Sequence, residues 1–278
     1  MTTVNLLGIA EHARLGESPY RVDRDGAPYV PAGDGGIVLD FQLGDSVFSL
    51  HADHAAPGAC LVHPDPAARH ALTTFACIGN PAQVRTGPAA GAQGVVLGKR
   101  GEEGRVVVAL QSEQLALLRP GDELLVRSSG QGWRPPRLDS EIAVGNIDPA
   151  TFAALPADLA NGGAAAIAVR AAVPSKLAGN GIGRPAVSWD LDLQLTEPPD
   201  GGQLLLGDLV AVTDLDARYN MGYRRGFVTI GIVVHGASPL PGHGPGITPI
   251  LSGPSSVITA DVTSEGRAGL TLEALQLQ

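Results

Sequence analysis

The stretch Phe-Val-Thr-Ile-Gly-Ile-Val-Val, residues 227–234, runs into a His-Gly pair and is soon followed by Gly-His-Gly-Pro-Gly at residues 242–246. The run is eight residues long, apolar and rich in β-branched side chains, a pattern typical of a buried β-strand. A strand that leads into a glycine-rich loop is a common position for a functional site, because the rigid strand fixes the loop residues. These residues therefore predict a β-rich fold with a functional loop beside one of its strands.

Short apolar runs of the same kind recur along the chain. Turn-forming residues bound most of these runs, and glycine (37) and proline (22) account for about a fifth of the 278 residues. Frequent turns between short strands are typical of small barrels and sandwiches. We therefore predict a mainly β protein, arranged as β-barrels or sandwiches with a few short helices; an α+β arrangement is the alternative. The main predicted strands are residues 38–41, 95–97, 106–110, 166–169, 191–195 and 209–212.

Two helices interrupt the strand pattern, at residues 112–118 and 149–159. Asp148 suits the N-cap of the second helix and Pro149 its first position, while Pro156 could end it early. No long linker separates the chain into independent parts. We therefore expect residues 1–150 to form an N-terminal β-rich half and residues 151–278 a C-terminal β-rich half closely packed on it.

The composition limits the classes of partner. The net charge is −9 and the pI about 5.2, so no general electrostatic attraction to nucleic acid or to an anionic membrane is expected. The two cysteines, Cys60 and Cys77, provide no disulfide framework, and the N-terminal residues lack the pattern of a signal peptide. We expect a cytoplasmic protein with free thiols that acts on a small molecule, and the sequence leaves a homo-oligomer open.

Histidines supply the candidate catalytic residues. His51, Asp53 and His54 place two imidazoles and a carboxylate within four residues, although exposed loop histidines are the alternative. Glycines flank His243 and leave its ring accessible, and His235 ends the strand quoted above. We predict that Asp53, His54 and His243 share one pocket and activate water, either directly or through a divalent metal that they bind.

Two glycine-rich segments are candidates for binding an anionic substrate. Residues 98–101 read Gly-Lys-Arg-Gly, and residues 179–184 form a possible anion-binding nest; a solvated basic turn and a flexible loop are the respective alternatives. The second segment is no dinucleotide fingerprint, because the required strand–turn–helix context is absent. The expected substrate-binding residues are Asn80, Lys99, Arg100, Asn180 and His235.

Several of these motifs together resemble one family. Residues 28–36, 53–58, 77–80, 98–99, 179–183 and 230–246 follow the order of the domain-of-unknown-function 4438 family of bacterial and archaeal proteins. The resemblance extends over nearly the whole chain and implies a mostly β fold without an established activity. Arg100 stands where the family pattern has histidine. The motif at residues 242–246 is also similar to acetamidase/formamidase proteins, which are β-rich amide hydrolases.

The favoured function is hydrolysis of a non-peptide C–N bond, as in an amide or cyclic amide. One alternative is a cofactor-free isomerase or cyclase in which His54 and His243 are the acid and the base. The other is a small-molecule binding or structural protein without turnover. Metal content separates the first hypothesis from the other two.

Overall fold

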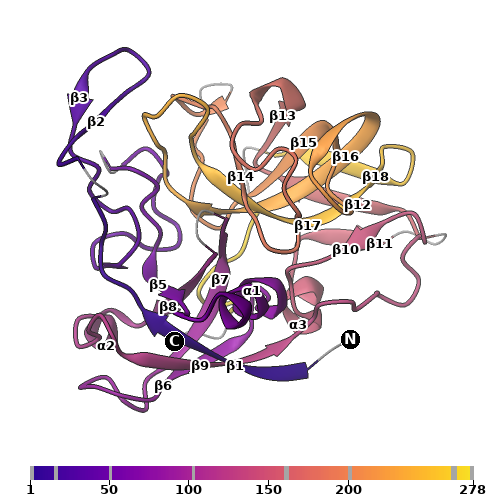
Figure 1. Ribbon diagram of the computed structural model, residues 1–278. Helices are drawn as coiled ribbons and strands as arrows, with labels where there is room; N and C mark the ends of the chain where they lie inside the picture. Colours follow the sequence, from indigo (N-terminus) through magenta and orange to yellow (C-terminus); the bar gives the residue numbers. More distant parts are fainter. Residues whose placement is uncertain are drawn as a thin grey trace.

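The computed structural model describes residues 3–15, 18–49, 52–101, 104–159, 163–199, 202–263 and 268–275 (Figure 1). Strands greatly outnumber helices, which confirms the predicted mainly β fold. The strands are β1 (Thr3–Ala10), β2 (Arg21–Val22), β3 (Pro28–Tyr29), β4 (Ile37–Val38), β5 (Gly58–Val62), β6 (Pro81–Val84), β7 (Gln93–Arg100), β8 (Arg105–Leu110), β9 (Glu123–Ser129), β10 (Ala143–Val144), β11 (Ala157–Leu159), β12 (Ala165–Val169), β13 (Ala171–Pro174), β14 (Leu191–Asp192), β15 (Leu209–Asp216), β16 (Gly222–His235), β17 (Gly246–Pro254) and β18 (Ile258–Val262).

Six antiparallel strands of the N-terminal region close into a barrel. Their order is β1-β9-β6-β7-β8-β5, and a pairing of β5 with β1 closes the ring, while β4 extends it beyond β5. Closure removes the unpaired edges that an open sheet of this size would expose. Figure 1 shows this barrel in indigo to magenta, below the orange and yellow strands of the C-terminal region.

The barrel strands that face the rest of the molecule are buried on both sides. In β8, Val106 and Val108 point into the barrel core, whereas Val107 and Ala109 point outward into a second core. This second core also contains Ile230 of β16, so it fills the space between the barrel and the C-terminal strands. Burial of both faces explains why β8 reads as an uninterrupted apolar run rather than an alternating one.

The C-terminal region contains a larger and a smaller sheet. The larger follows the order β10-β17-β16-β15-β13, with β14 also paired to β17; only the β13–β15 pairing is parallel. The smaller sheet has the order β11-β12-β18. In the larger sheet, β17 lies between β14 and the end of β16, and this arrangement positions the site described below.

A long segment between β4 and β5 crosses from the barrel to the C-terminal sheet. Phe41 and Val47 of this segment are buried in a third core, together with residues of β15, β16 and β17. Backbone hydrogen bonds fix the crossing: the Val47 N–H donates to the carbonyl of Leu204, and the Ala237 N–H donates to the carbonyl of Val47. The segment therefore delivers its last residues, Asp53 and His54, to the C-terminal half of the molecule.

The helices are short. α1 (Pro66–Phe75) was not predicted; α2 (Ser112–Leu115) and α3 (Pro149–Ala153) were predicted, but both end earlier than expected. Asp148 caps α3 as predicted, because its carboxylate accepts a hydrogen bond from the Thr151 N–H at 2.8 Å. A short 3-10 helix, η1 (Ser175–Leu177), completes the set. Within the described ranges, no helix combines the length and apolarity needed to span a bilayer.

Candidate metal centre

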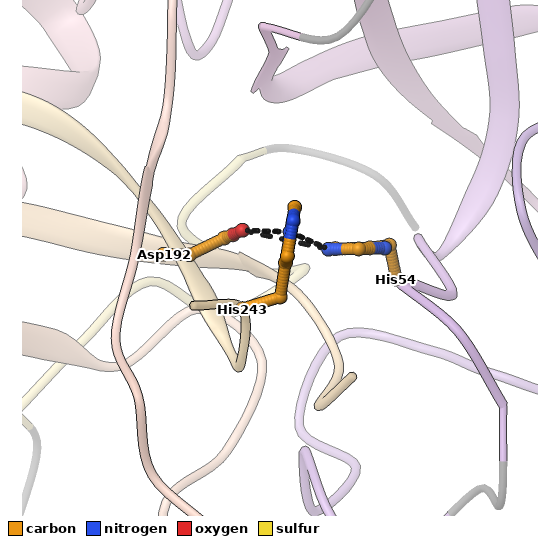
Figure 2. Close-up of side chains that lie close together, drawn as sticks. All are labelled: His54, Asp192 and His243. Atoms are coloured by element: carbon orange, nitrogen blue, oxygen red, sulfur yellow. Dashed lines mark hydrogen bonds and ion pairs between the residues drawn. The ribbon is translucent and has the colours of Figure 1, made fainter. Parts of the chain in front are cut away.

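Three nitrogen and oxygen atoms from distant parts of the chain converge at one point (Figure 2). His54 Nε2 lies 2.9 Å from His243 Nδ1, and Asp192 Oδ2 lies 3.4 Å from the former and 2.8 Å from the latter. Ligands bound tetrahedrally at 2.0–2.1 Å from a metal stand about 3.3 Å apart, so these separations are close to those of a metal site.

Each of the three residues is held by a different element. His54 lies near the end of the crossing segment, where its φ of 53° is a left-handed conformation that non-glycine residues seldom adopt. Asp192 is the second residue of β14, and His243 belongs to the loop between β16 and β17. Gly244 of this loop packs so closely on the Leu193 carbonyl that a Cβ there would collide with it. Gly244 therefore serves close packing, whereas Gly242 has open space where a Cβ would lie and instead supplies a left-handed φ of 79°.

The ligand atoms are buried, with one open side. The side chains of His54 and Asp192 are each 2% exposed, whereas that of His243 is 19% exposed. Asp192 Oδ2 accepts no well-directed hydrogen bond from any described residue, although the two imidazole nitrogens lie beside it. A buried carboxylate oxygen without such a bond is costly, and a cation at the point of convergence would satisfy it.

Asp53 lies behind His54 rather than at the point of convergence. Its Oδ1 approaches His54 Nδ1 obliquely at 2.5 Å and accepts a hydrogen bond from Ser238 Oγ at 2.7 Å, while its Oδ2 accepts one from Arg21 at 2.6 Å. Burial opposes ionisation of Asp53, but His54, Ser238 and Arg21 together hold its pKa well below the usual value. The carboxylate favours a proton on Nδ1 of His54, which leaves Nε2 free to bind a ligand.

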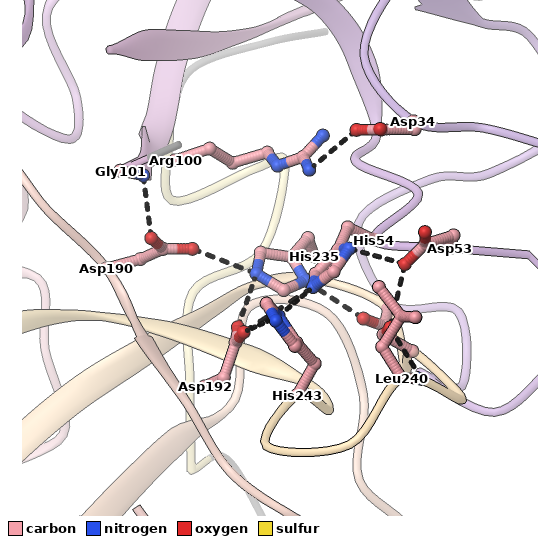
Figure 3. A network of polar contacts seen from close by, with 12 residues as sticks. Asp34, Asp53, His54, Arg100, Gly101, Asp190, Asp192, His235, Leu240 and His243 are labelled. Carbon is pink, nitrogen blue, oxygen red and sulfur yellow. Dashed lines mark hydrogen bonds and ion pairs between the residues drawn. The ribbon is translucent and has the colours of Figure 1, made fainter. Parts of the chain in front are cut away.

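His235 and Asp190 extend the cluster on the other side of Asp192 (Figure 3). His235 Nε2 lies 2.9 Å from Asp190 Oδ2 and 3.1 Å from Asp192 Oδ1. Burial raises the pKa of Asp192, but the imidazoles of His235, His243 and His54 outweigh it and keep the pKa well below normal. Desolvation alone would lower the pKa of His235. The carboxylates of Asp190 and Asp192 outweigh it and raise this pKa to about 10.

Comparisons with known proteins place the chain in a family. Residues 20–153 match the model of the N-terminal domain of unknown function DUF4438, and residues 154–269 match that of its C-terminal domain. The chain belongs to the DUF4438 family. This DUF4438 protein is also similar to a protein of known structure, "Crystal structure of TM1086", with 36% identity and a TM-score of 0.91 over 96% of this chain and 94% of that chain. No curated protein matches the sequence significantly.

The structure brings together His54, His235 and His243 and places Asp53 directly behind them. His51 lies outside the described residues. Asn180 contributes through its backbone: its N–H donates to the Gly242 carbonyl, and its carbonyl accepts from the Asp192 N–H, so it braces two parts of the site.

The other predicted substrate-binding residues are engaged elsewhere in this DUF4438 protein. Asn80 accepts a hydrogen bond from the Cys77 N–H and donates one to the Ser129 carbonyl. The Lys99 ammonium is fully buried and donates to Asn146 Oδ1 and to the carbonyls of Thr74 and Val187. Arg100 is equally buried and pairs with Asp34 at 3.1 Å. Asn80, Lys99 and Arg100 thus make buried contacts within the protein and do not line the point where His54, Asp192 and His243 converge.

Asp192 is a site residue that the sequence analysis missed, and Asp190 stood out only as part of Trp189-Asp190, which could line a pocket or simply begin a strand. The two aspartates stand two positions apart in the stretch Trp-Asp-Leu-Asp-Leu, residues 189–193, so their side chains share one face of an extended chain. Two carboxylates on one strand face, followed by a histidine at a neighbouring strand end, were the available signal.

Proposed function

We propose that this protein is a divalent-metal-dependent hydrolase of a non-peptide C–N bond, such as that of an amide or cyclic amide, in a small polar substrate. The observation that carries the proposal is the convergence of His54, His243 and Asp192 with a buried carboxylate oxygen to which none of the described residues donates a well-directed hydrogen bond. In this proposal Asp192 takes the ligand position that the sequence analysis gave to Asp53, and Asp53 orients His54.

Two imidazoles and one carboxylate suit borderline divalent metals such as Zn²⁺, and also Fe²⁺ or Mn²⁺. Three protein ligands leave a coordination position for water on the side where His243 is partly exposed. A bound cation would lower the pKa of such a water toward about 7 and so would supply hydroxide at neutral pH.

The expected reaction is hydrolysis by this hydroxide. The hydroxide oxygen would form a C–O bond to the carbonyl carbon of the substrate, and polarisation of the carbonyl oxygen is the second contribution that a metal held by His54, His243 and Asp192 would supply. The C–N bond then breaks, and the departing nitrogen takes the proton that water released. The products are a carboxylate and an amine, or an opened ring when the substrate is a cyclic amide.

A cavity of about 270 Å³ lies next to residues that contact His54 and Asp53, and its lining does not include the three proposed ligands themselves. Ala237 and Ser238 link the cavity to the cluster, because they line the cavity while the Ala237 carbonyl accepts from the His54 N–H and Ser238 donates to Asp53. Arg24 and neighbouring aspartates bring both signs of charge to the lining. This volume lies just below the usual range for ligand pockets, and its polarity favours a small polar metabolite.

The alternative of metal-free acid–base chemistry has one specific observation in its favour. His54 Nε2 and His243 Nδ1 are within hydrogen-bond distance, so one can donate and the other accept a proton. This arrangement would suit an isomerase or cyclase, but it leaves Asp192 Oδ2 without a well-directed hydrogen bond. We therefore place metal-dependent hydrolysis first.

Metal analysis and a substrate panel test the proposal. The purified protein, reconstituted with Zn²⁺, Mn²⁺ or Fe²⁺, is assayed against primary amides, lactams and cyclic imides by release of amine or carboxylate. His54→Ala, His243→Ala and Asp192→Asn should lose bound metal and at least about 100-fold in turnover, whereas the exposed His12→Ala is the matched control. Turnover that survives complete removal of metal would favour the acid–base alternative, and ligand binding without turnover would favour a binding protein.

A further inference from the structure

We propose that Asp190, Asp192 and His235 form a second divalent-cation site, and that the Asp192 carboxylate bridges it to the first. The bridging role rests on the proposed function above, whereas the ligand set of the second site stands on its own contacts. The result would be a two-metal centre built across β14, β17 and β16.

The three ligand atoms of the second site already surround one point. Asp190 Oδ2 and Asp192 Oδ1 lie 2.9 and 3.1 Å from His235 Nε2, and all three atoms lie within 4.8 Å of one another. Their side chains are 6%, 2% and 1% exposed. One nitrogen and two carboxylate oxygens form a suitable ligand set for Zn²⁺ or Mn²⁺.

The hydrogen bonding of His235 orients its Nε2 as a ligand. Nδ1 lies 2.9 Å from the Gly236 carbonyl, which can only accept, so this nitrogen carries a hydrogen. Metal-binding histidines commonly donate their second ring N–H to a backbone carbonyl in this way. Nε2 then faces two carboxylate oxygens, at 2.9 and 3.1 Å, and either a proton on Nε2 or a cation in its place makes this arrangement attractive.

The second site concentrates negative charge that a divalent cation would neutralise. Asp190 and Asp192 bring two carboxylates into a buried space, and Asp190 Oδ1 is held by the Gly101 N–H at 2.7 Å. Arg100 contributes positive charge nearby, but its guanidinium pairs directly with Asp34. Buried carboxylates are stable when they are paired or coordinate a metal.

A glycine in the central strand β17 allows Asp192 and His235 to approach each other. Gly246 of β17 is in register with Asp192 of β14 on one side and with His235 of β16 on the other. A Cβ at Gly246 would fall on the imidazole of His235. The glycine therefore leaves an opening in the central strand, across which the carboxylate and the imidazole approach.

Asp192 faces both sites at once (Figure 3). Oδ1 is directed to His235, while Oδ2 is directed to His54 and His243. Two metals bridged in this way usually stand about 3.5–4 Å apart in hydrolases. One cation would activate the water and the other would polarise the carbonyl oxygen of the substrate.

Stoichiometry and direct location of the metal test the inference. Metal-free protein is titrated with Zn²⁺ and, separately, Mn²⁺, and bound metal is counted by elemental analysis after gel filtration. We expect two equivalents per chain in the wild type, one in His235→Gln and in Asp190→Asn, and two in the control His12→Ala. Anomalous scattering at the zinc edge from wild-type crystals should give two peaks, one on each side of the Asp192 carboxylate.

The outcomes separate this inference from the proposed function. One equivalent in the wild type, with a single peak between His54 and His243, would overturn the second site and keep the first; the His235–Asp190 pair would then position Asp192 through hydrogen bonds. Absence of bound metal would overturn both. The wild-type count and the peak positions decide the matter even if a substituted protein fails to fold.

Discussion

Replacing Gly246 by alanine tests how tightly the cluster depends on one missing side chain. Gly246 has no left-handed φ, so alanine is compatible with its backbone, and the effect of the substitution is steric. The new methyl group would fall on the His235 ring, which would have to move by more than about 1 Å to restore an ordinary carbon contact of roughly 3.5 Å.

Such a movement breaks the contacts that hold His235. Its Nε2 lies 2.9 Å from Asp190 and 3.1 Å from Asp192, so a shift of the ring breaks these contacts. Both carboxylates would then remain buried without their partner. Breaking a buried charged pair typically costs about 3–5 kcal/mol. We therefore expect the free energy of unfolding of metal-free Gly246→Ala to fall by about 3–5 kcal/mol, which corresponds to a loss of roughly 10 °C in Tm.

Chemical denaturation of four proteins provides the assay: the wild type, Gly246→Ala, His235→Ala and the double variant. Gly222→Ala is the matched control, because Gly222 begins β16 and has open space where its Cβ would lie. If the clash is responsible, Gly246→Ala should cost little once the His235 ring is gone, so the two single effects should be strongly non-additive. Additive effects, or a Gly246→Ala protein as stable as the Gly222→Ala control, would refute the reasoning.

Three further predictions follow from buried charged and thiol groups. Asp53→Asn should weaken metal binding about 10–100-fold without abolishing it, because Asp53 orients a ligand and does not itself bind; competition with a chromogenic chelator measures this, and unchanged affinity would remove Asp53 from the site. Burial lowers the pKa of Lys99 to about 8 from 10.5, so the unfolded chain binds more protons between these pH values. The free energy of unfolding of the wild type should therefore rise relative to Lys99→Met by about 3 kcal/mol from pH 8 to 10.5; a relative fall would contradict the lowered pKa. Cys60 and Cys77 are buried free thiols whose pKa burial raises, so a thiol reagent should react slowly with the native protein and find two thiols after unfolding without reductant; rapid reaction of the native protein would show that they are accessible.

The fold class was accessible from sequence because most strands carry a local signal. β8 and the second part of β16, residues 227–234, are apolar runs, and their burial makes the signal strong. Strand β1 was missed, because residues 1–30 look mixed and polar and its place in the barrel depends on pairing with the distant β9. Helix α1 could have been found, since Asp65-Pro66 repeats the Asp-Pro start that located α3.

The candidate site was only partly accessible for a physical reason. His54 and His243 stand out because His51 and Asp53 stand close to the first in sequence and glycines flank the second. Asp192 lies in an alternating Leu-Asp-Leu pattern, which normally places the polar residue toward solvent. It is buried where His54 of the crossing segment and His243 of the loop between β16 and β17 meet its carboxylate, and no local pattern encodes that meeting.

The crossing segment gives metal binding a thermodynamic meaning beyond catalysis. His54 arrives from the barrel side of the chain, whereas Asp192 lies in the C-terminal sheet and His243 in a loop between two of its strands, so a cation held by all three would cross-link the two regions. A ligand that binds only the docked arrangement stabilises it by about 2.7 kcal/mol when its concentration is 100 times its Kd. The coupling between docking of the segment and metal binding is reciprocal. Substitutions of Phe41 or Val47 that weaken the packing of the crossing segment on the C-terminal strands should therefore raise the Kd for metal, although neither side chain approaches the metal ligands.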